Sequence, residues 1–442
     1  MFANDHDTIF ALASGVGRAA IAVLRISGPE CSAVLRMIAP GADFPDRRAV
    51  LRTLRHPYSR EPLDRALITW FCAPRSFTGE EMAEVSVTGG RAVTSAFIKA
   101  LALIPGLRLA EPGEFAWRAF MNGKIDLSEV DGLADLVEAE TEAQRRQAQR
   151  IAGGALSREC DAIRTSLLEA MAIVETQIDF TDVEDASDFT LETVKDAARG
   201  AIERIDRALA SADAAARLRE GFTVVIAGPP NVGKSTLMNA LAGRDVAITS
   251  PVPGTTRDLI EVFLDLRGYP VILVDTAGVR ESHDPIEQEG VARARRRAES
   301  ADLILWLNDR ADDLGPSLGS ATLVVRTKMD LKQADPSAGK PAGVAISAKT
   351  GAGVDRLLDV IAELAEERMS SREPTLLTLE RHRRGFQEAR QALAATLVPG
   401  AAEPELIAED LRRAALAMAR IVGRIGAEDV LGEIFARLCV GK

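Results

Sequence analysis

The sequence predicts a multidomain protein that combines an α+β N-terminal domain, an all-α helical bundle made from two chain segments, and an α/β domain inserted between those segments. Its 442 residues exceed what one hydrophobic core normally serves. With 47% apolar and 27% charged residues, the composition is that of an ordinary globular protein. The hydrophobic pattern changes along the chain, which places the three domains at residues 1–120, at 121–217 together with 373–442, and at 218–372.

The N-terminal domain is predicted from short β-rich runs separated by glycine and proline. These runs are "AAIAVLRISG" (19–28), "ALITWFCA" (66–73) and "AEVSVTGG" (83–90), and a helix-like segment follows near 92–103. Strands and helices that are mixed in this way are typical of a compact α+β domain.

The helical segments are predicted from apolar residues at spacings of three and four. Ile163, Leu167, Met171, Val174 and Ile178 form one such stripe, a second runs over 191–209 beyond the acidic stretch 179–188, and others follow after 375. Each stripe must be buried, so we expect the two separated segments to pair in one bundle.

The inserted domain is predicted from apolar strand-like runs that alternate with helical or loop segments. The first is "FTVVIAG" (222–228), and the others are "LIEVFLDL" (259–266), "VILVDTAG" (271–278), "DLILWLND" (302–309), "TLVVRTKMD" (322–330) and "GVAIS" (343–347). This alternation indicates a mainly parallel sheet. Residues 309–321 contain two glycines and a proline where such a domain normally has a crossover helix.

Charge and cysteine content exclude several classes of protein. The net charge of −11 argues against a broad basic surface for nucleic acid, and we expect the arginine clusters at 145–150, 293–297 and 381–384 to be solvated helix faces. The four cysteines, Cys31, Cys72, Cys160 and Cys439, form no CxxC pair, so neither zinc nor a disulfide framework is expected. Because no apolar run is long enough for a membrane helix and "MFANDHDTIF" lacks signal-peptide features, we expect a cytoplasmic protein without a membrane segment.

A phosphate-binding motif follows the first strand of the inserted domain. "GPPNVGKST" (228–236) fits G-x-x-x-x-G-K-[ST] and precedes the helix-like "TLMNALAG". Backbone N–H groups of such a loop surround the phosphates, Lys234 reaches the β- and γ-phosphates, and the Ser235 hydroxyl is a ligand for magnesium. The sequence therefore predicts a P-loop nucleotide site.

Four further motifs, each near a strand end, indicate a GTPase. "PGTTRD" (253–258) provides Thr256 as a second hydroxyl for magnesium, "DTAG" (275–278) brings Asp275 near the metal and Gly278 near the γ-phosphate, and "TKMD" (327–330) and "SAK" (347–349) follow the last strands.

The "TKMD" motif departs from the usual N-K-x-D of GTPases. The Asp330 carboxylate accepts from both the ring N–H and the amine of guanine, which adenine does not offer, whereas Thr327 lacks the amide of asparagine. We predict that GTP is still preferred over ATP, with binding weakened by about 1 kcal/mol, the value of one neutral hydrogen bond. Equal calorimetric affinity for ATP and GTP would contradict this prediction.

The whole chain resembles the family of tRNA-modification GTPases called MnmE or TrmE. The similarity lies in "PNVGKSTLMNALAGRDVAITSPVPGTTRD", in "DTAGVRESHDPIEQEG", and in the flanking segments "GRAAIAVLRISG", "RSFTGEEMAEVSVTGG", "EPGEFAWRAFMNGKIDLSEVDGLADLVEAETEAQ" and the final "CVGK". The resemblance implies a tetrahydrofolate-binding N-terminal domain, a helical domain from two chain segments, and an inserted Ras-like GTPase domain.

The resemblance also implies an activity, cofactors and partners. Such proteins are homodimers that form a heterotetramer with the FAD-containing protein MnmG. The complex places an aminomethyl or carboxymethylaminomethyl group on C5 of the wobble uridine of certain tRNAs, with 5,10-methylene- or 5-formyl-tetrahydrofolate as the one-carbon source. GTP hydrolysis requires potassium and magnesium and accompanies dimerisation of the GTPase domains. Which tRNAs are modified, and whether glycine or ammonium is the co-substrate, stay open.

The family's nucleotide site maps onto residues of this sequence. Glu287 matches the catalytic glutamate that orients water, Lys234 is the second catalytic residue, and Glu287→Ala is expected to lower kcat while GTP binding persists. Potassium ligands would be Asn231, Ser250, Val252 and Thr255, and magnesium ligands Ser235 and Thr256. The GTP-binding segments would comprise Asn231, Val232, Gly233, Lys234, Ser235, Thr236, Ser250, Pro251, Val252, Pro253, Gly254, Thr255, Thr256, Asp275, Thr276, Ala277, Gly278, Thr327, Lys328, Met329, Asp330, Ser347, Ala348 and Lys349.

The family's folate site maps onto Arg25, Glu84, Lys124 and Lys442. A carboxylate such as Glu84 can pair with the pterin amino and N–H groups, and basic residues suit the glutamate carboxylates of the cofactor. We expect the chain end "FARLCVGK" to be ordered, with Lys442 near the folate. Cys439 is either a nucleophile or a buried packing residue.

Two alternative functions compete with a tRNA-modifying GTPase. One is a ribosome-assembly or translation GTPase, which would need a basic RNA-binding module. The other is a folate-dependent one-carbon protein whose nucleotide domain has become structural, although Lys234, Ser235, Thr256, Asp275 and Asp330 are all present. A GTPase assay in potassium and in sodium separates the first hypothesis from the other two.

Overall fold

A computed structural model of the chain describes residues 7–15, 17–41, 43–179, 187–248, 261–275, 301–309, 321–331, 343–398 and 403–425 together with residues 435, 438 and 441. The chain divides into two compact units. The first unit comprises Met1–Ala134, Ile151–Glu169 and Arg412–Lys442, and the second comprises Asp135–Arg150 and Ala170–Leu411.

The first unit contains a mixed sheet with the strand order β3-β4-β5-β2-β1-β6. Its strands are β1 (Thr8–Leu12), β2 (Ile21–Ser27), β3 (Ala49–Arg55), β4 (Pro62–Phe71), β5 (Met82–Thr88) and β6 (Leu107–Leu109). All neighbours are antiparallel except β1 and β6. The three β-rich runs of the sequence correspond to β2, β4 and β5, which confirms a strand in each.

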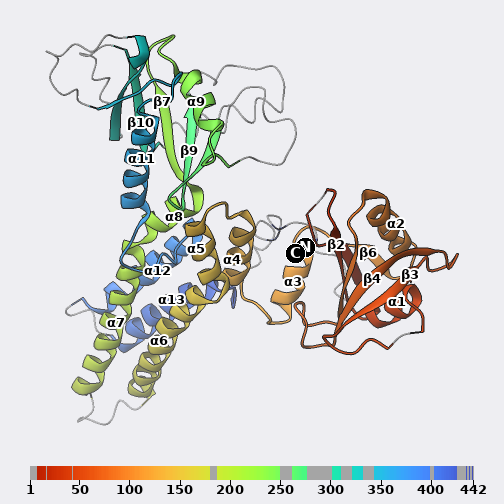
Figure 1. Cartoon of the computed structure of the whole chain (residues 1–442). Coiled ribbons are helices and arrows are strands. Elements are labelled where there is room, and N and C mark those ends of the chain that lie inside the picture. The colour runs from red at the N-terminus through yellow and green to blue at the C-terminus, as the bar shows by residue number, and fades with distance from the viewer. Residues whose placement is uncertain are drawn as a thin grey trace. The chain divides into compact units, whose positions relative to one another are not determined.

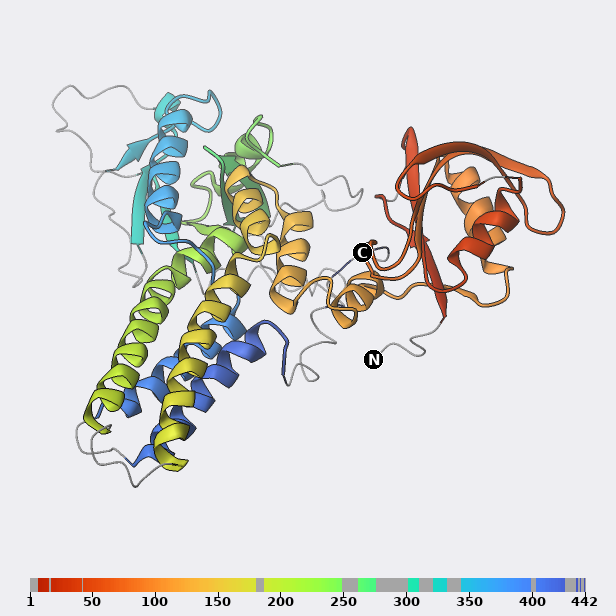
Figure 2. The same ribbon diagram turned by 90° about the horizontal axis from the view of Figure 1, so that it is seen from below.

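One face of this sheet is covered by helices α1 (Cys31–Ile38) and α2 (Arg91–Ala102), as Figures 1 and 2 show. Alternate residues of β2 and β5 pack on Leu35 of α1 and Phe97 of α2, as the two-residue period of a strand requires. The helix predicted near 92–103 is therefore α2, whereas α1 was not predicted.

Helix α3 (Glu114–Met121) extends the core of the first unit, and α4 (Leu127–Glu138) follows it. Phe115 packs with Ile9 and Ala11 of β1. Elsewhere on α3, the Trp117 ring packs edge to face against the Phe435 ring, with ring centroids 5.3 Å apart. A residue close to the end of the chain thus belongs to the core of this unit, beside Leu438.

In the described part of the chain, six further helices precede or follow the second sheet. They are α5 (Glu142–Ala152), α6 (Ala155–Asp179), α7 (Ser187–Ala210), α8 (Ala212–Glu220), α12 (Glu380–Thr396) and α13 (Pro404–Ile421). Within the second unit, α7 and α12 pack side by side, and the ion pair of Arg390 with Asp206 joins them (Figures 1 and 2). Helices from either side of the α/β region in the sequence therefore contact each other within this unit.

The sheet of the second unit has the order β12-β11-β10-β7-β9-β8. Its strands are β7 (Phe222–Ala227), β8 (Glu261–Leu266), β9 (Tyr269–Asp275), β10 (Leu303–Asn308), β11 (Ala321–Arg326) and β12 (Val344–Ala345), and all neighbours are parallel except β8 and β9. Helices α9 (Lys234–Ala242) and α11 (Val354–Met369) share one core with Val224 and Ile226 of β7. The predicted parallel sheet is confirmed, while residues 310–320 of the shortened connection lie outside the described part.

Three of the four cysteines lie in the described part of the structure. None of Cys31, Cys72 and Cys160 takes part in a disulfide bond within the described residues, and burial raises the pKa of the Cys31 thiol well above its ordinary value. Within the part of the chain that the structure describes, no helix has both the length and the apolar character needed to cross a membrane.

Candidate functional site

The predicted nucleotide residues of the second unit lie along one edge of its sheet. Because β7, β9, β10, β11 and β12 run in parallel, their carboxyl ends meet at this edge, where ligands bind in open α/β sheets. The loop 228–233 follows β7, Asp275 ends β9, residues 327–330 follow β11, and Ser347 follows β12. The sheet therefore orders the motifs from the expected base end at β12 to the expected phosphate and metal end at β9.

The phosphate end is built by the turn from β7 into α9. A side chain at Gly228 would overlap the carbonyl of Leu307 in β10, so only glycine allows the loop to approach that strand so closely. Lys234 begins α9, and its Nζ donates to the carbonyls of Gly228 (2.8 Å) and Pro229 (3.0 Å). These are neutral partners, which leaves the Lys234 charge for a phosphate.

The metal end contains Ser235 and Asp275. The Ser235 hydroxyl donates to the Asp275 carboxylate at 3.4 Å, and Asp275 is aligned with Ile226 of β7. Hard oxygen donors of this kind suit magnesium, which usually binds one or two protein groups together with phosphate oxygens and water. Among the described residues no group of three His, Cys, Asp or Glu is arranged to hold a metal by itself.

The base end contains Asp330 and Ser347. The Ser347 hydroxyl donates to Asp330 at 2.7 Å, and this hydrogen bond lowers the pKa of the Asp330 carboxyl, which favours the ionised acceptor that guanine needs. Lys328 has a left-handed backbone with φ of 59°, and its Nζ lies 3.5 Å from Asp309. Ala348 and Lys349 follow Ser347 at the same edge.

Thr327 faces the phosphate loop. Its side chain is buried, and its Oγ1 donates to the carbonyl of Val232 at 2.8 Å. A second carbonyl, that of Asn308, lies 3.2 Å from the same oxygen. No sequence rule pointed to this link, because Thr327 and Val232 are far apart in the chain.

Several predicted residues lie outside the described part of the structure. They are Ser250, Pro251, Val252, Pro253, Gly254, Thr255, Thr256, Thr276, Ala277, Gly278, Glu287, Cys439 and Lys442. Of the expected potassium ligands, only Asn231 is described. Its φ of 60° is left-handed, a conformation that asparagine tolerates better than most residues.

The predicted folate residues lie in the first unit, and two of them are brought together. Arg25 and Glu84 are aligned on β2 and β5, and Nη2 of Arg25 lies 2.9 Å from Glu84 Oε1. The guanidinium also lies 5.3 Å from the ring of Phe77 and 5.7 Å from that of Phe115, two residues that were not predicted as site residues. Their only sequence signal was their position in the quoted family segments.

The Arg25 guanidinium also reaches the chain end within the first unit. Its Nη1 donates to the carbonyl of Gly441 at 3.3 Å, and a side chain at Gly441 would overlap Leu12 and Ala13. Its Nε is buried without a hydrogen-bond partner among the described residues, so an acceptor from a ligand fits there. Lys124 lies beside Gly79, and neither a hydrogen bond nor an ion pair joins it to Arg25 or Glu84.

A buried ionic network supports this part of the first unit. Arg118 contacts Glu114 at 3.0 Å, Asp7 at 2.7 Å and Glu80 at 3.2 Å, and Arg108 contacts Asp7 and Glu114. Burial by itself would raise the pKa of Glu114, but hydrogen bonds from Arg108, the Glu111 amide and Arg118 outweigh it and lower that pKa. The network fixes α3, and with it Phe115, against the sheet.

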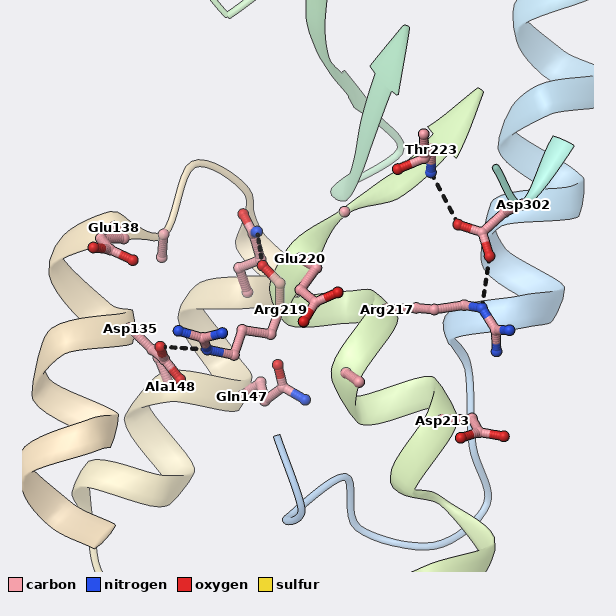
Figure 3. A pocket seen from close by; sticks show the side chains of 14 residues that line it. Asp135, Glu138, Gln147, Ala148, Asp213, Arg217, Arg219, Glu220, Thr223 and Asp302 are labelled. Atoms are coloured by element: carbon pink, nitrogen blue, oxygen red, sulfur yellow. Dashed lines mark hydrogen bonds and ion pairs between the residues drawn. The ribbon is translucent and has the colours of Figure 1, made fainter. Parts of the chain in front are cut away.

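The second unit also contains a cavity of about 540 Å³, shown in Figure 3. It lies at the amino ends of β7 and β10, opposite the nucleotide motifs, and contains none of the predicted site residues. Arg217 bonds to Asp302 at 2.7 Å, Asp302 accepts from the Thr223 amide at 3.0 Å, and Arg219 bonds to Asp135 at 2.7 Å. These ion pairs anchor helix α8, so the cavity is a junction between elements rather than the nucleotide site.

Comparisons with known proteins cover both units. Residues 8–124 match the family model described as GTP-binding protein TrmE N-terminus, and residues 127–439 match that of the MnmE helical domain. The chain is 49% identical over 439 residues to the tRNA modification GTPase MnmE of Methylobacterium sp. (strain 4-46), covering 99% of this chain and 100% of that protein. It is 47% identical to the protein of the same name from Rhodopseudomonas palustris (strain ATCC BAA-98 / CGA009), covering 98% and 99%.

A solved structure is also similar to part of the chain. The G domain of the T. maritima FeoB iron transporter is 29% identical and covers 32% of this chain and 98% of its own, with a TM-score of 0.22.

Proposed function

The chain belongs to the MnmE family of tRNA modification GTPases and hydrolyses GTP to GDP and phosphate, and on that premise we propose the finer details of its reaction. It is a potassium-dependent GTPase that, together with an FAD-containing MnmG-like protein, adds an aminomethyl or carboxymethylaminomethyl group to C5 of the wobble uridine of certain tRNAs. A tetrahydrofolate derivative supplies the one-carbon unit. The ribosome-assembly alternative receives no support, because relatives named for tRNA modification match nearly the entire chain.

The observation that supports GTP hydrolysis at this site is the row of motifs along the carboxyl edge of the second sheet. Lys234, Ser235 and Asp275 lie together at one end, and Asp330 with its Ser347 partner lies at the other. A nucleotide that spans this edge would direct its phosphates to Lys234 and its guanine to Asp330.

Each residue has a distinct task in this proposal. Lys234 exchanges its carbonyl partners for phosphate oxygens, and Ser235 with Thr256 would hold magnesium. Asn231, Ser250, Val252 and Thr255 would hold potassium, and Glu287 would orient the attacking water. Bound cations at this position neutralise charge that develops on the phosphates.

The proposed folate site is supported by the surroundings of Arg25. A pterin could stack near Phe77 and Phe115 and pair with Glu84, while the buried Nε of Arg25 offers a donor. Lys124 and Lys442 would meet the carboxylates of the cofactor. We assign this site to a domain at 1–120, with a helical domain at 121–217 and 373–442 and a GTPase domain at 218–372.

The assembly belongs to the proposal as well. We expect a homodimer whose GTPase domains approach each other during hydrolysis, and a heterotetramer with the MnmG-like protein that binds tRNA. The net charge of −11 suggests that the partner supplies much of the basic surface for tRNA.

Two measurements test the proposal. Steady-state GTP hydrolysis should be fast in potassium chloride and slow in sodium chloride at equal ionic strength, and equal rates would contradict the potassium site. Mass spectrometry of tRNA nucleosides from a strain that lacks the gene should show unmodified wobble uridines. Unchanged nucleosides there would refute the role in tRNA modification.

A further inference from the structure

The link between Thr327 and Val232 joins the two ends of the nucleotide site. Thr327 follows β11 in the base-recognition motif, whereas Val232 belongs to the phosphate loop after β7. The Thr327 residue is only 3% exposed, Val232 is 1% exposed, and their hydrogen bond measures 2.8 Å. Because β10 lies between β7 and β11, this bond ties together segments from non-adjacent strands.

The hydroxyl of Thr327 has a single proton to donate. Two carbonyl oxygens lie within reach, that of Val232 at 2.8 Å and that of Asn308 at 3.2 Å. The Asn308 carbonyl already accepts from the Thr327 amide at 2.8 Å. The Val232 carbonyl is nearer, and within the described residues no loop or turn amide donates to it, so both points favour Val232 as the acceptor.

A hydroxyl used in this way is not available to guanine. The acceptors of the base on its imidazole side are N7 and O6, and a side chain that recognises them must donate a proton. The Asp330 carboxylate only accepts, so it pairs with the opposite edge of the base.

We propose that Thr327 is a positioning residue for the phosphate loop, and that it does not recognise the base. It fixes the Val232 carbonyl, and through it the loop whose N–H groups and Lys234 receive the phosphates. Guanine is then selected through Asp330 without a contact from residue 327 to N7. This inference rests on the proposed binding of GTP along this edge.

The test combines a hydroxyl deletion with a modified base. Thr327→Val keeps the shape and removes the hydroxyl, Thr327→Ser keeps the hydroxyl, and Thr53→Val, at an exposed site of β3, is the matched control. Calorimetry would measure the full-length protein with GDP and with 7-deaza-GDP, which lacks the N7 acceptor. Hydrogen exchange of residues 228–235 would be measured without nucleotide.

We expect Thr327→Val to lose the same binding affinity for both nucleotides. Wild type binds GDP and 7-deaza-GDP alike, and Thr327→Val weakens both by about tenfold, the value of one hydrogen bond and its unsatisfied acceptor. Exchange in the loop becomes faster in Thr327→Val, whereas Thr327→Ser recovers most of the protection and the affinity.

Two outcomes would overturn the inference. A weaker binding of 7-deaza-GDP by wild type that disappears in Thr327→Val would show that residue 327 contacts N7. Unchanged affinity and exchange in a folded Thr327→Val protein would show that the bond has no positioning role. A wild-type protein that fails to bind GDP at all would refute the nucleotide site itself, which is a separate result.

Discussion

The two units stabilise their functional regions with different chemistry. In the first unit, Arg118 and its three carboxylate partners form a buried ionic network behind the Arg25 site. In the second unit, Thr327 and the Lys234 ammonium at the nucleotide edge donate to neutral backbone carbonyls. A charge that is already paired stabilises the fold, whereas one held by neutral groups stays available to a ligand.

This difference suggests that substitutions will have separable effects. Loss of a charge in the first network should reduce stability because a buried partner is left uncompensated. Loss of the Lys234 charge should reduce catalysis and leave the fold nearly intact.

Arg118→Met should be the most damaging change. It leaves the carboxylates of Asp7, Glu80 and Glu114 without their shared cation, and removing one partner of a buried pair costs about 3–5 kcal/mol. Hydrogen exchange over β6 and α3 should rise accordingly. Arg65→Met, at an exposed position of β4, is the matched control and should change exchange little. Equal rates of hydrogen exchange in the two variants would contradict a stabilising role of the network.

Lys234→Ala should show the opposite pattern. The loss of a cation at the phosphates should reduce kcat by about a hundredfold to a thousandfold, the value of one group that stabilises transition-state charge. The melting temperature should stay close to that of wild type, because the partners of Lys234 are loop carbonyls. A large loss of stability with retained turnover would contradict the contrast between the units.

Acid should weaken the first unit specifically. Burial alone would raise the pKa values of Asp7 and Glu114, but bonds from Arg108 and Arg118 outweigh it and lower both. Their stabilisation is therefore complete above the ordinary values of 3.8 and 4.5 and is lost as pH falls through the lowered ones. The protection of α3 backbone amides from hydrogen exchange, corrected for the pH dependence of the intrinsic exchange rate, should be constant above about pH 5.5. It should fall below about pH 4.5. Glu114→Gln should flatten this dependence, and an unchanged slope would exclude Glu114 as its source.

Gln147→Met should have the smallest effect. The Gln147 amide is buried and donates to the carbonyls of Ala215 at 3.1 Å and Thr375 at 3.4 Å, so it links α5 to α8 and to the segment before α12. Replacing these neutral bonds should cost about 1 kcal/mol. Urea denaturation measures this loss of unfolding free energy. A loss as large as that of Arg118→Met would contradict the expectation that neutral hydrogen bonds stabilise the fold less than the ionic network does.

The nucleotide edge could be predicted because its motifs follow strand ends directly. The sequence of β7 and the loop after it places Lys234 and Ser235 by spacing alone, and the parallel sheet then aligns Asp275 and Asp330 at the same edge. The role of Thr327 could not be predicted in this way, because its partner Val232 depends on how two non-adjacent strands are staggered.

The surroundings of Arg25 were less predictable for the same physical reason. Family resemblance pointed to Arg25 and Glu84, but Phe77, Phe115 and the carbonyl of Gly441 reach the guanidinium from three distant chain segments. The ionic network likewise draws on four chain segments: Glu114 and Arg118 share α3, whereas Asp7 lies 111 positions from Arg118. Periodicity and local motifs contain no information on such contacts.

The close approach of Gly441 to β1 has a consequence for how this protein can vary. A methyl group at 441 would collide with the Leu12 carbonyl, and its φ of 107° disfavours any other residue, whereas Gly90 has open space and an ordinary negative φ. In a library of all single substitutions, position 90 should therefore accept alanine while position 441 rejects every replacement. The position of the β1 backbone thus restricts which residue can be encoded at position 441, more than four hundred residues later in the chain.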